Sequence, residues 1–200
     1  MTRVDGTDGV GDVHPRIPRQ SARDQGGLPP VNPDDDARLS AALAAVVSGA
    51  RRRALRDGDR QIDSAHLLHS LLDADPEAYA VFEAEPQLPR LLGYLVQRSI
   101  GYGLRWQGIV EDSGAVPVVP SAEGFSPLAA GAMEYACARA DHRGDGPASG
   151  IDLLAAILVD PESRAAEVLG RAGIDARAVF TRIDDRLPGG FRGGQPRNGR

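Results

Sequence analysis

The 200-residue sequence contains no lysine, since all 23 of its basic residues are arginine. A P-loop holds phosphate through a lysine, and Schiff-base enzymes and Ser-Lys dyads also require one. Composition alone therefore excludes these three kinds of nucleotide-binding or catalytic site.

Cysteine and long apolar runs are also scarce. Cys137 is the single cysteine, so no intramolecular disulfide can form, which fits a reducing compartment. No run approaches the roughly 18 apolar residues that a membrane-spanning helix needs, and no apolar signal core is found near the N-terminus. The formal net charge of -5 argues against nucleic-acid binding over the whole surface. We therefore expect a cytoplasmic protein with no membrane partner.

Residues 34–98 are predicted to form four short helices, because apolar residues recur there at helical spacing. The acidic run at 34–36 suits the positive N-terminus of the first helix, and Gly58 ends that helix. Asp63 and Ser64 can cap the second helix. The apolar positions that define the four helices are Leu39, Leu43, Val46, Val47, Ala50 and Ala54, then Leu67, Leu68, Leu71 and Leu72, then Tyr79, Val81 and Phe82, and finally Leu88, Leu91, Leu92 and Leu95.

Stretches rich in proline and glycine divide the chain. Residues 1–33 have no periodic apolar pattern and are predicted to be a disordered arm. Residues 99–123 are predicted to be a linker, and 188–200 a disordered basic tail. Pro86 and Pro89 are expected to separate the third helix from the fourth.

An internal repeat appears when the sequence is shifted against itself by 86 positions. The shift places Ser40 on Ser126 and Gly58 on Gly144, and it aligns the apolar segments of both parts. The second unit is then residues 124–187. Strand signals are nearly absent, so the sequence predicts an all-α, pseudo-symmetric tandem of two four-helix units, in which each unit covers an apolar face of the other.

The last two helices of the second unit follow from the same reasoning. The third is expected to end at Gly170 and Gly173. The fourth is defined by the apolar positions Ala178, Val179, Ile183 and Leu187. The second unit thus repeats the order of elements predicted for the first.

Several motifs of the second unit resemble the Clp N-terminal repeat of Clp-type AAA+ protein unfoldases. They are Phe125-Ser126-Pro127, Arg143-Gly144, Leu153-Leu154, the segment from Arg164 to Leu169, and Ala172-Gly173-Ile174-Asp175. Because the repeat is duplicated, the resemblance covers residues 36–187. It implies a domain that recruits substrates and adaptors and performs no chemistry, here without ATPase modules.

The resemblance also implies functional residues. Family members of the ClpC type bind phosphoarginine through a Thr-Glu-His segment in each repeat, and the corresponding segments here are Ser64-Ala65-His66 and Gly150-Ile151-Asp152. Ala65 and Ile151 replace both glutamates, so these pockets are degenerate, although Asp152 stands one position away. A second family site is a groove between the repeats, for which the candidates are Leu39, Ser40, Phe125 and Ser126.

We therefore expect a non-enzymatic binding module of protein quality control, without a cofactor or metal. Its expected partners are a Clp-type unfoldase, its adaptors or client peptides, and peptide-like small molecules, with which it would act as an adaptor, a docking domain or a competitor for ligands. Nucleic acid is not favoured as a partner. The alternative is a regulatory protein that binds nucleic acid through its tail, which has Arg192, Arg197 and Arg200 and no acid.

Other residues are interpreted as structural. His66 and His69 lie three apart, yet no further ligand pair accompanies them, so we expect solvated histidines rather than a metal site. Cys137 is expected to pack as a small hydrophobe. A hydrolase would have to use His66 or His142, but no nucleophile motif is present. The apolar linker residues are expected to pack back on the repeats: Tyr102, Leu104 and Trp106.

Overall fold

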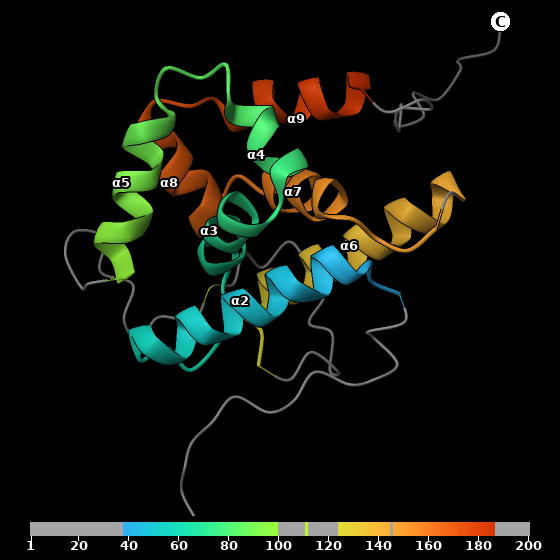
Figure 1. Cartoon of the computed structure of the whole chain (residues 1–200), viewed down its shortest axis with the longest axis horizontal. Coiled ribbons are helices and arrows are strands. Elements are labelled where there is room, and N and C mark those ends of the chain that lie inside the picture. The colour runs from blue at the N-terminus through green and yellow to red at the C-terminus, as the bar shows by residue number, and fades with distance from the viewer. Residues whose placement is uncertain (1–37, 100–110, 112–123, 145, 187–200) are drawn as a thin grey trace, which may run out of the picture.

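The computed structural model describes residues 38–99, 111, 124–144 and 146–186, and the regular elements within these ranges are α-helices (Figure 1). The predicted all-α class is thus confirmed for the described residues. The predicted arm, the predicted tail and linker residues Tyr102, Leu104 and Trp106 lie outside them.

The first half of the chain contains α2 (Ala41–Asp57), α3 (Ser64–Ala74), α4 (Pro76–Phe82) and α5 (Leu88–Ser99). These are the four helices that the apolar spacing predicted. The apolar positions that the spacing predicted to lie in the core are buried, with two exceptions. Tyr79 is exposed, and Leu92 is half-buried.

Ser40 caps the start of α2, and the acidic run at 34–36 lies outside the described residues. The hydroxyl of Ser40 accepts a hydrogen bond from the backbone N–H of Leu43 at 3.2 Å. The backbone N–H of Ser40 donates to the carbonyl of Ala148 at 2.8 Å, which holds the chain extended just before the helix. A residue tied to a distant segment in this way cannot continue a helix backwards, so α2 begins at Ala41.

Two helix boundaries also differ from expectation. Pro89 lies inside the first turn of α5, where its missing N–H would have no intrahelical partner. Helix α8 continues through Gly170, and Gly173 alone ends it, with a positive φ of 85° that a residue with a Cβ rarely adopts. By contrast, Gly58 ends α2 as predicted, with a φ of 74°.

The second half contains α6 (Pro127–Arg143), α7 (Gly150–Val159), α8 (Arg164–Ala172) and α9 (Ala176–Arg186). Helices α2 and α6 each have 17 residues. Both are capped by serine and ended by glycine, Ser40 and Gly58 in α2 and Ser126 and Gly144 in α6. No helix in the described ranges is both long and apolar enough to cross a membrane.

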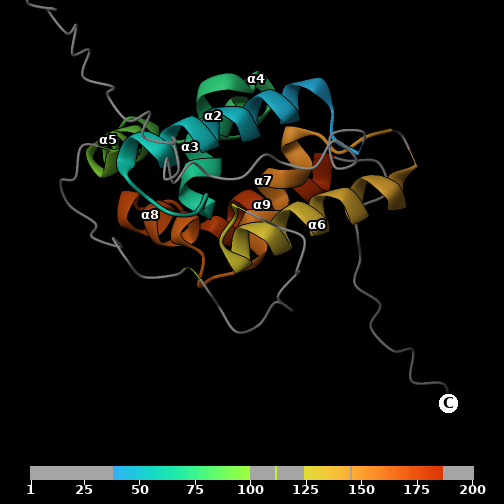
Figure 2. The same ribbon diagram turned by 90° about the horizontal axis from the view of Figure 1, so that it is seen from below.

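Six of the eight described helices surround a central pair, α3 and α7 (Figures 1 and 2). Helices α3 and α7 contact each other, and α2 packs on α3 as α6 packs on α7. On the remaining sides, α5 packs against α8 and α4 packs against α9. Each of these last two pairs joins one helix of the first half to one of the second half, so neither half is packed separately.

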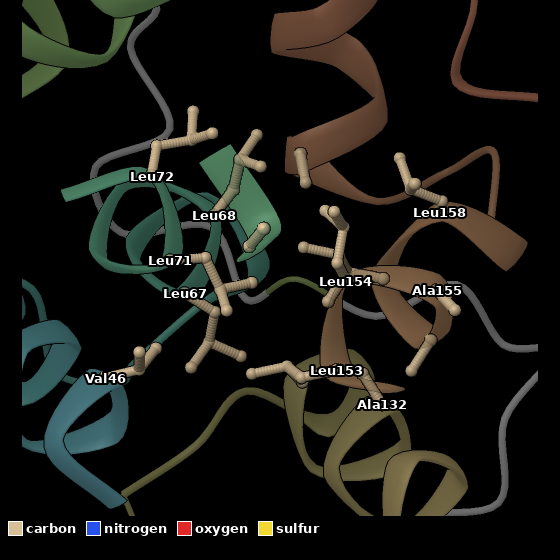
Figure 3. Packing of buried hydrophobic residues seen from close by; sticks show 14 of the residues in the cluster. Val46, Leu67, Leu68, Leu71, Leu72, Ala132, Leu153, Leu154, Ala155 and Leu158 are labelled. Atoms are coloured by element: carbon tan, nitrogen blue, oxygen red, sulfur yellow. The ribbon is translucent and has the colours of Figure 1, made fainter. Parts of the chain in front are cut away.

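The core is one continuous cluster of apolar side chains that crosses from α3 to α7 (Figure 3). Leu67, Leu68 and Leu71 of the predicted leucine stripe lie on the side of α3 that faces α7 (Figure 3). In Figure 3, Leu71 of α3 and Leu154 of α7 lie close to the boundary between the two helices. Cys137 is also buried, as predicted for a small packed residue.

Candidate functional site

The N-termini of α3 and α7 carry the two segments that the resemblance identified as pockets. In both helices a hydrogen bond joins the cap residue to the third residue of the helix, as in a capping box. In α3 the Asp63 carboxylate accepts from the N–H of His66 at 2.9 Å. In α7 the Asp152 carboxylate accepts from the N–H of Ser149 at 2.9 Å. The local sequence therefore directs these polar side chains back onto the helix ends.

The predicted pocket residues lie mostly in the interior of the protein. Ile151 is half-buried. The other five are buried: Ser64, Ala65, His66, Gly150 and Asp152. These segments thus contribute to the packing around α3 and α7.

His66 is buried, with 1% of its surface exposed, so the expectation of a solvated histidine is wrong. Its Nδ1 lies 2.9 Å from Oδ1 of Asp63, and its Nε2 lies 3.3 Å from Oδ2 of Asp59 and 3.6 Å from Oδ2 of Asp57. Burial disfavours charge on the imidazole, but the nearby carboxylates of Asp57, Asp59 and Asp63 outweigh burial and raise the pKa of His66 to about 10. The imidazole is therefore positively charged at neutral pH.

Asp63 joins three helices through its carboxylate. Arg98 of α5 and Arg164 of α8 both donate to Oδ2 of Asp63, while His66 of α3 contacts Oδ1. Burial alone would raise the pKa of Asp63, but His66 and the two guanidinium groups hold that pKa well below its usual range. The ionised carboxylate thus connects α3 to helices from both halves of the chain.

Glu111 is the residue that sequence reasoning missed entirely. It lies in the predicted linker, yet it is only 5% exposed. Its carboxylate accepts from the N–H and hydroxyl of Ser64, from the hydroxyl of Ser126 at 2.7 Å and from the N–H of Arg164 at 2.8 Å. One linker side chain therefore satisfies groups at the N-termini of α3, α6 and α8. No periodic pattern in the sequence marks Glu111, because a single acid in a predicted linker has no signal.

The second predicted pocket holds an internal arginine. Both carboxylate oxygens of Asp152 accept hydrogen bonds from the guanidinium of Arg143 in α6, one of them at 2.9 Å. Burial raises the pKa of Asp152, but Arg143 and Ser149 outweigh burial and lower it. Asp152 thus forms the bidentate contact with guanidinium that the resemblance assigns to this region, and its partner is a residue of the same chain.

The four groove candidates lie where the two halves meet. Ser40 donates through its N–H to Ala148, and Ser126 donates through its N–H to Ile62 at 2.8 Å. Leu39 and Phe125 are both buried and belong to the continuous core. The structure therefore brings the four residues to the seam between the halves, but the two apolar side chains point into the core.

A close approach of two helices requires glycine at position 150. A Cβ added there would lie 2.7 Å from Cγ of Asp75, whose carboxylate is held by the N–H groups of Glu77 and Ala78. We expect Gly150→Ala to lower the free energy of unfolding by about 1 to 3 kcal/mol, because the packed helices must separate. Urea denaturation followed by circular dichroism measures this loss.

Gly93→Ala is the matched control, because Gly93 is inside α5 and a Cβ there meets nothing within 4 Å. It should be neutral, or stabilise by about 0.5 to 1 kcal/mol through helix propensity. Equal effects of the two substitutions would contradict the close packing of Gly150 against Asp75.

A surface pocket of about 470 Å³ opens where α3 meets α4. Tyr79 lines it and is 38% exposed, although its spacing on the helix predicted a core position. The acidic residues Asp73, Asp75 and Glu83 line the same pocket as four apolar residues, Leu72, Ala74, Pro76 and Ala80. This mixture suits a peptide segment that carries both apolar and basic side chains.

Comparison with protein-family models finds no match, and comparison with curated proteins finds none either. The likeness to the Clp N-terminal repeat therefore depends on the motifs quoted above.

Proposed function

We propose that this protein is a non-catalytic, cytoplasmic protein- and peptide-binding module, built from two Clp-N-like repeats. It acts in Clp-type protein quality control as an adaptor, a substrate-docking domain or a competitor for ligands of the unfoldase. Client segments dock in the pocket that Tyr79 lines, between α3 and α4.

One observation carries the proposal, namely a reciprocal pair of backbone contacts between the halves. Leu39 forms a bridge with Ala148, and Ile62 forms a bridge with Phe125. Leu39 and Phe125 are 86 positions apart, and so are Ile62 and Ala148. Each half therefore contributes the same two positions to the seam. Two equivalent units related by a pseudo-two-fold axis are expected to form such reciprocal contacts.

The polar network supports binding over hydrolysis. A serine hydrolase requires a serine hydroxyl that donates to a histidine. The hydroxyl of Ser64, two positions before His66, donates instead to Glu111. His66 itself is surrounded by Asp57, Asp59 and Asp63. Ser64 and Asp63 are engaged in contacts that hold helices together, and recognition is left to the surface.

The first test measures binding of fluorescently labelled casein, a client that is unfolded without denaturant, by fluorescence anisotropy. The full-length protein should bind it saturably at micromolar concentration. Tyr79→Ala should weaken binding several-fold, because a half-exposed aromatic ring in a pocket supplies much of the apolar contact area.

Val96→Ala is the matched control, since Val96 is an exposed apolar residue of α5 that does not line the pocket. It should leave the affinity unchanged. Absence of casein binding by the full-length protein would contradict the proposal. Steeply salt-dependent RNA binding that is lost on deletion of residues 188–200 would favour the nucleic-acid alternative.

A further inference from the structure

Two buried polar groups beside α3 lack hydrogen-bond partners. Neither carboxylate oxygen of Asp57 accepts a hydrogen bond, although the Asp57 side chain is only 6% exposed. Nε2 of His66, which is 1% exposed, has no hydrogen-bond partner either. The charged neighbours of Asp57 are Nε of Arg56 at 3.5 Å and Nε2 of His66 at 3.6 Å. Buried polar atoms are normally hydrogen-bonded, so this pair requires an explanation.

The distances from Nε2 of His66 to the carboxylates of Asp57 and Asp59 match the spacing between ligands of a metal ion. Nε2 of His66 lies 3.6 Å from Oδ2 of Asp57 and 3.3 Å from Oδ2 of Asp59. A tetrahedral zinc ion about 2.0 to 2.1 Å from nitrogen and oxygen ligands separates them from each other by about 3.3 to 3.4 Å. Asp59, Asp63 and His66 also place one ligand atom each within 4.8 Å of one another.

We propose that His66 Nε2, Asp57 and Asp59 bind one zinc-like divalent transition-metal ion. An imidazole with two carboxylates favours zinc over magnesium, because magnesium prefers oxygen ligands alone. Three protein ligands leave a fourth position for water. The site joins the end of α2 to the first turn of α3, and it is separate from the pocket at Tyr79.

The surroundings of His66 suit a metal ligand. Nδ1 of His66 lies 2.9 Å from Oδ1 of Asp63, so its N–H can donate to that carboxylate and leave Nε2 directed at the ion. Arg98 donates to Oδ2 of Asp59 at 3.2 Å, and a carboxylate has enough lone pairs to accept Arg98 and bind an ion together. Zinc displaces the proton of Nε2 to solvent and then balances the charges of Asp57 and Asp59.

The test uses the full-length protein freed of metal by chelation and titrated with Zn²⁺ in a calorimeter. We expect one ion per chain. Titration with Co²⁺ should produce the strong visible absorption of a tetrahedral site, and Mg²⁺ should not compete. Asp57→Asn should weaken Zn²⁺ affinity by more than the 10- to 100-fold typical of residues outside the coordination shell. The variant should remain folded, because asparagine has the size of aspartate and the carboxylates of Asp59 and Asp63 still face His66.

Asp73→Asn is the matched control, because Asp73 is an exposed acid of α3 that pairs with Arg53 outside the site. Its zinc affinity should equal that of the unaltered protein. His142→Gln should also bind normally, which excludes a surface histidine as the source of binding. The proposal is overturned if the unaltered protein binds no Zn²⁺, or if folded Asp57→Asn binds it equally well.

Discussion

Glu111→Ala is expected to lower the free energy of unfolding by about 3 to 5 kcal/mol, although the residue belongs to the predicted linker. The substitution leaves the N–H groups of Ser64 and Arg164 without their acceptor at two buried helix ends. Each buried donor without a partner costs about 1 to 3 kcal/mol, and loss of a buried charge partner adds to that cost. Urea denaturation of the full-length protein, followed by circular dichroism, measures the change.

Glu134→Ala provides the control for removal of a glutamate. Glu134 also forms a long-range pair, with Arg38 at 3.3 Å, but both side chains are more than 40% exposed. Exposed ion pairs contribute about 0 to 1 kcal/mol, so this variant should differ little from the unaltered protein. If Glu111→Ala were as mild as Glu134→Ala, the carboxylate of Glu111 would not connect the helix N-termini.

Leu154→Ala is expected to destabilise the protein by about 2 to 5 kcal/mol. Leu154 is fully buried in α7, in the part of the core that continues into α3 (Figure 3). Truncation removes apolar contact and leaves a cavity that the surrounding helices fill only in part. The loss should appear in a single unfolding transition, because the core that the two halves share is continuous.

Leu55→Ala makes the same chemical change at a solvent-facing position of α2, where the leucine is half-exposed. It should change stability by no more than about 0.5 kcal/mol. A mild effect at Leu154 as well would contradict its place in the core. Two separate unfolding transitions would instead show that the halves fold independently.

Local features of the fold could be predicted from the sequence. Helix periodicity and the internal repeat together located the eight described helices. Gly58 was recognised as the end of α2 because glycine tolerates a positive φ. Asp63 was recognised as a cap because a short acidic side chain accepts from nearby backbone N–H groups. These features depend on residues within a few positions of each other, so a single sequence contains enough information for them.

Contacts between distant segments could not be predicted in this way. Ser40 caps α2 with an extended backbone, and its N–H donates to the carbonyl of Ala148, which lies far along the chain. Tyr79 was placed in the core by its spacing, but the structure leaves it at the edge of a pocket. Spacing along a helix defines a face, whereas the neighbouring helices decide whether that face is covered.

In the candidate sites, too, the local features could be predicted from the sequence and the contacts between distant segments could not. The sequence by itself determined which residues stand at the starts of α3 and α7, including the replacement of both family glutamates by Ala65 and Ile151. Only the tertiary structure decided that His66 is enclosed by carboxylates and that Glu111 is buried between helix N-termini. The physical reason is that burial and charge pairing depend on which segments meet in space, and residues 47 to 101 positions apart meet here.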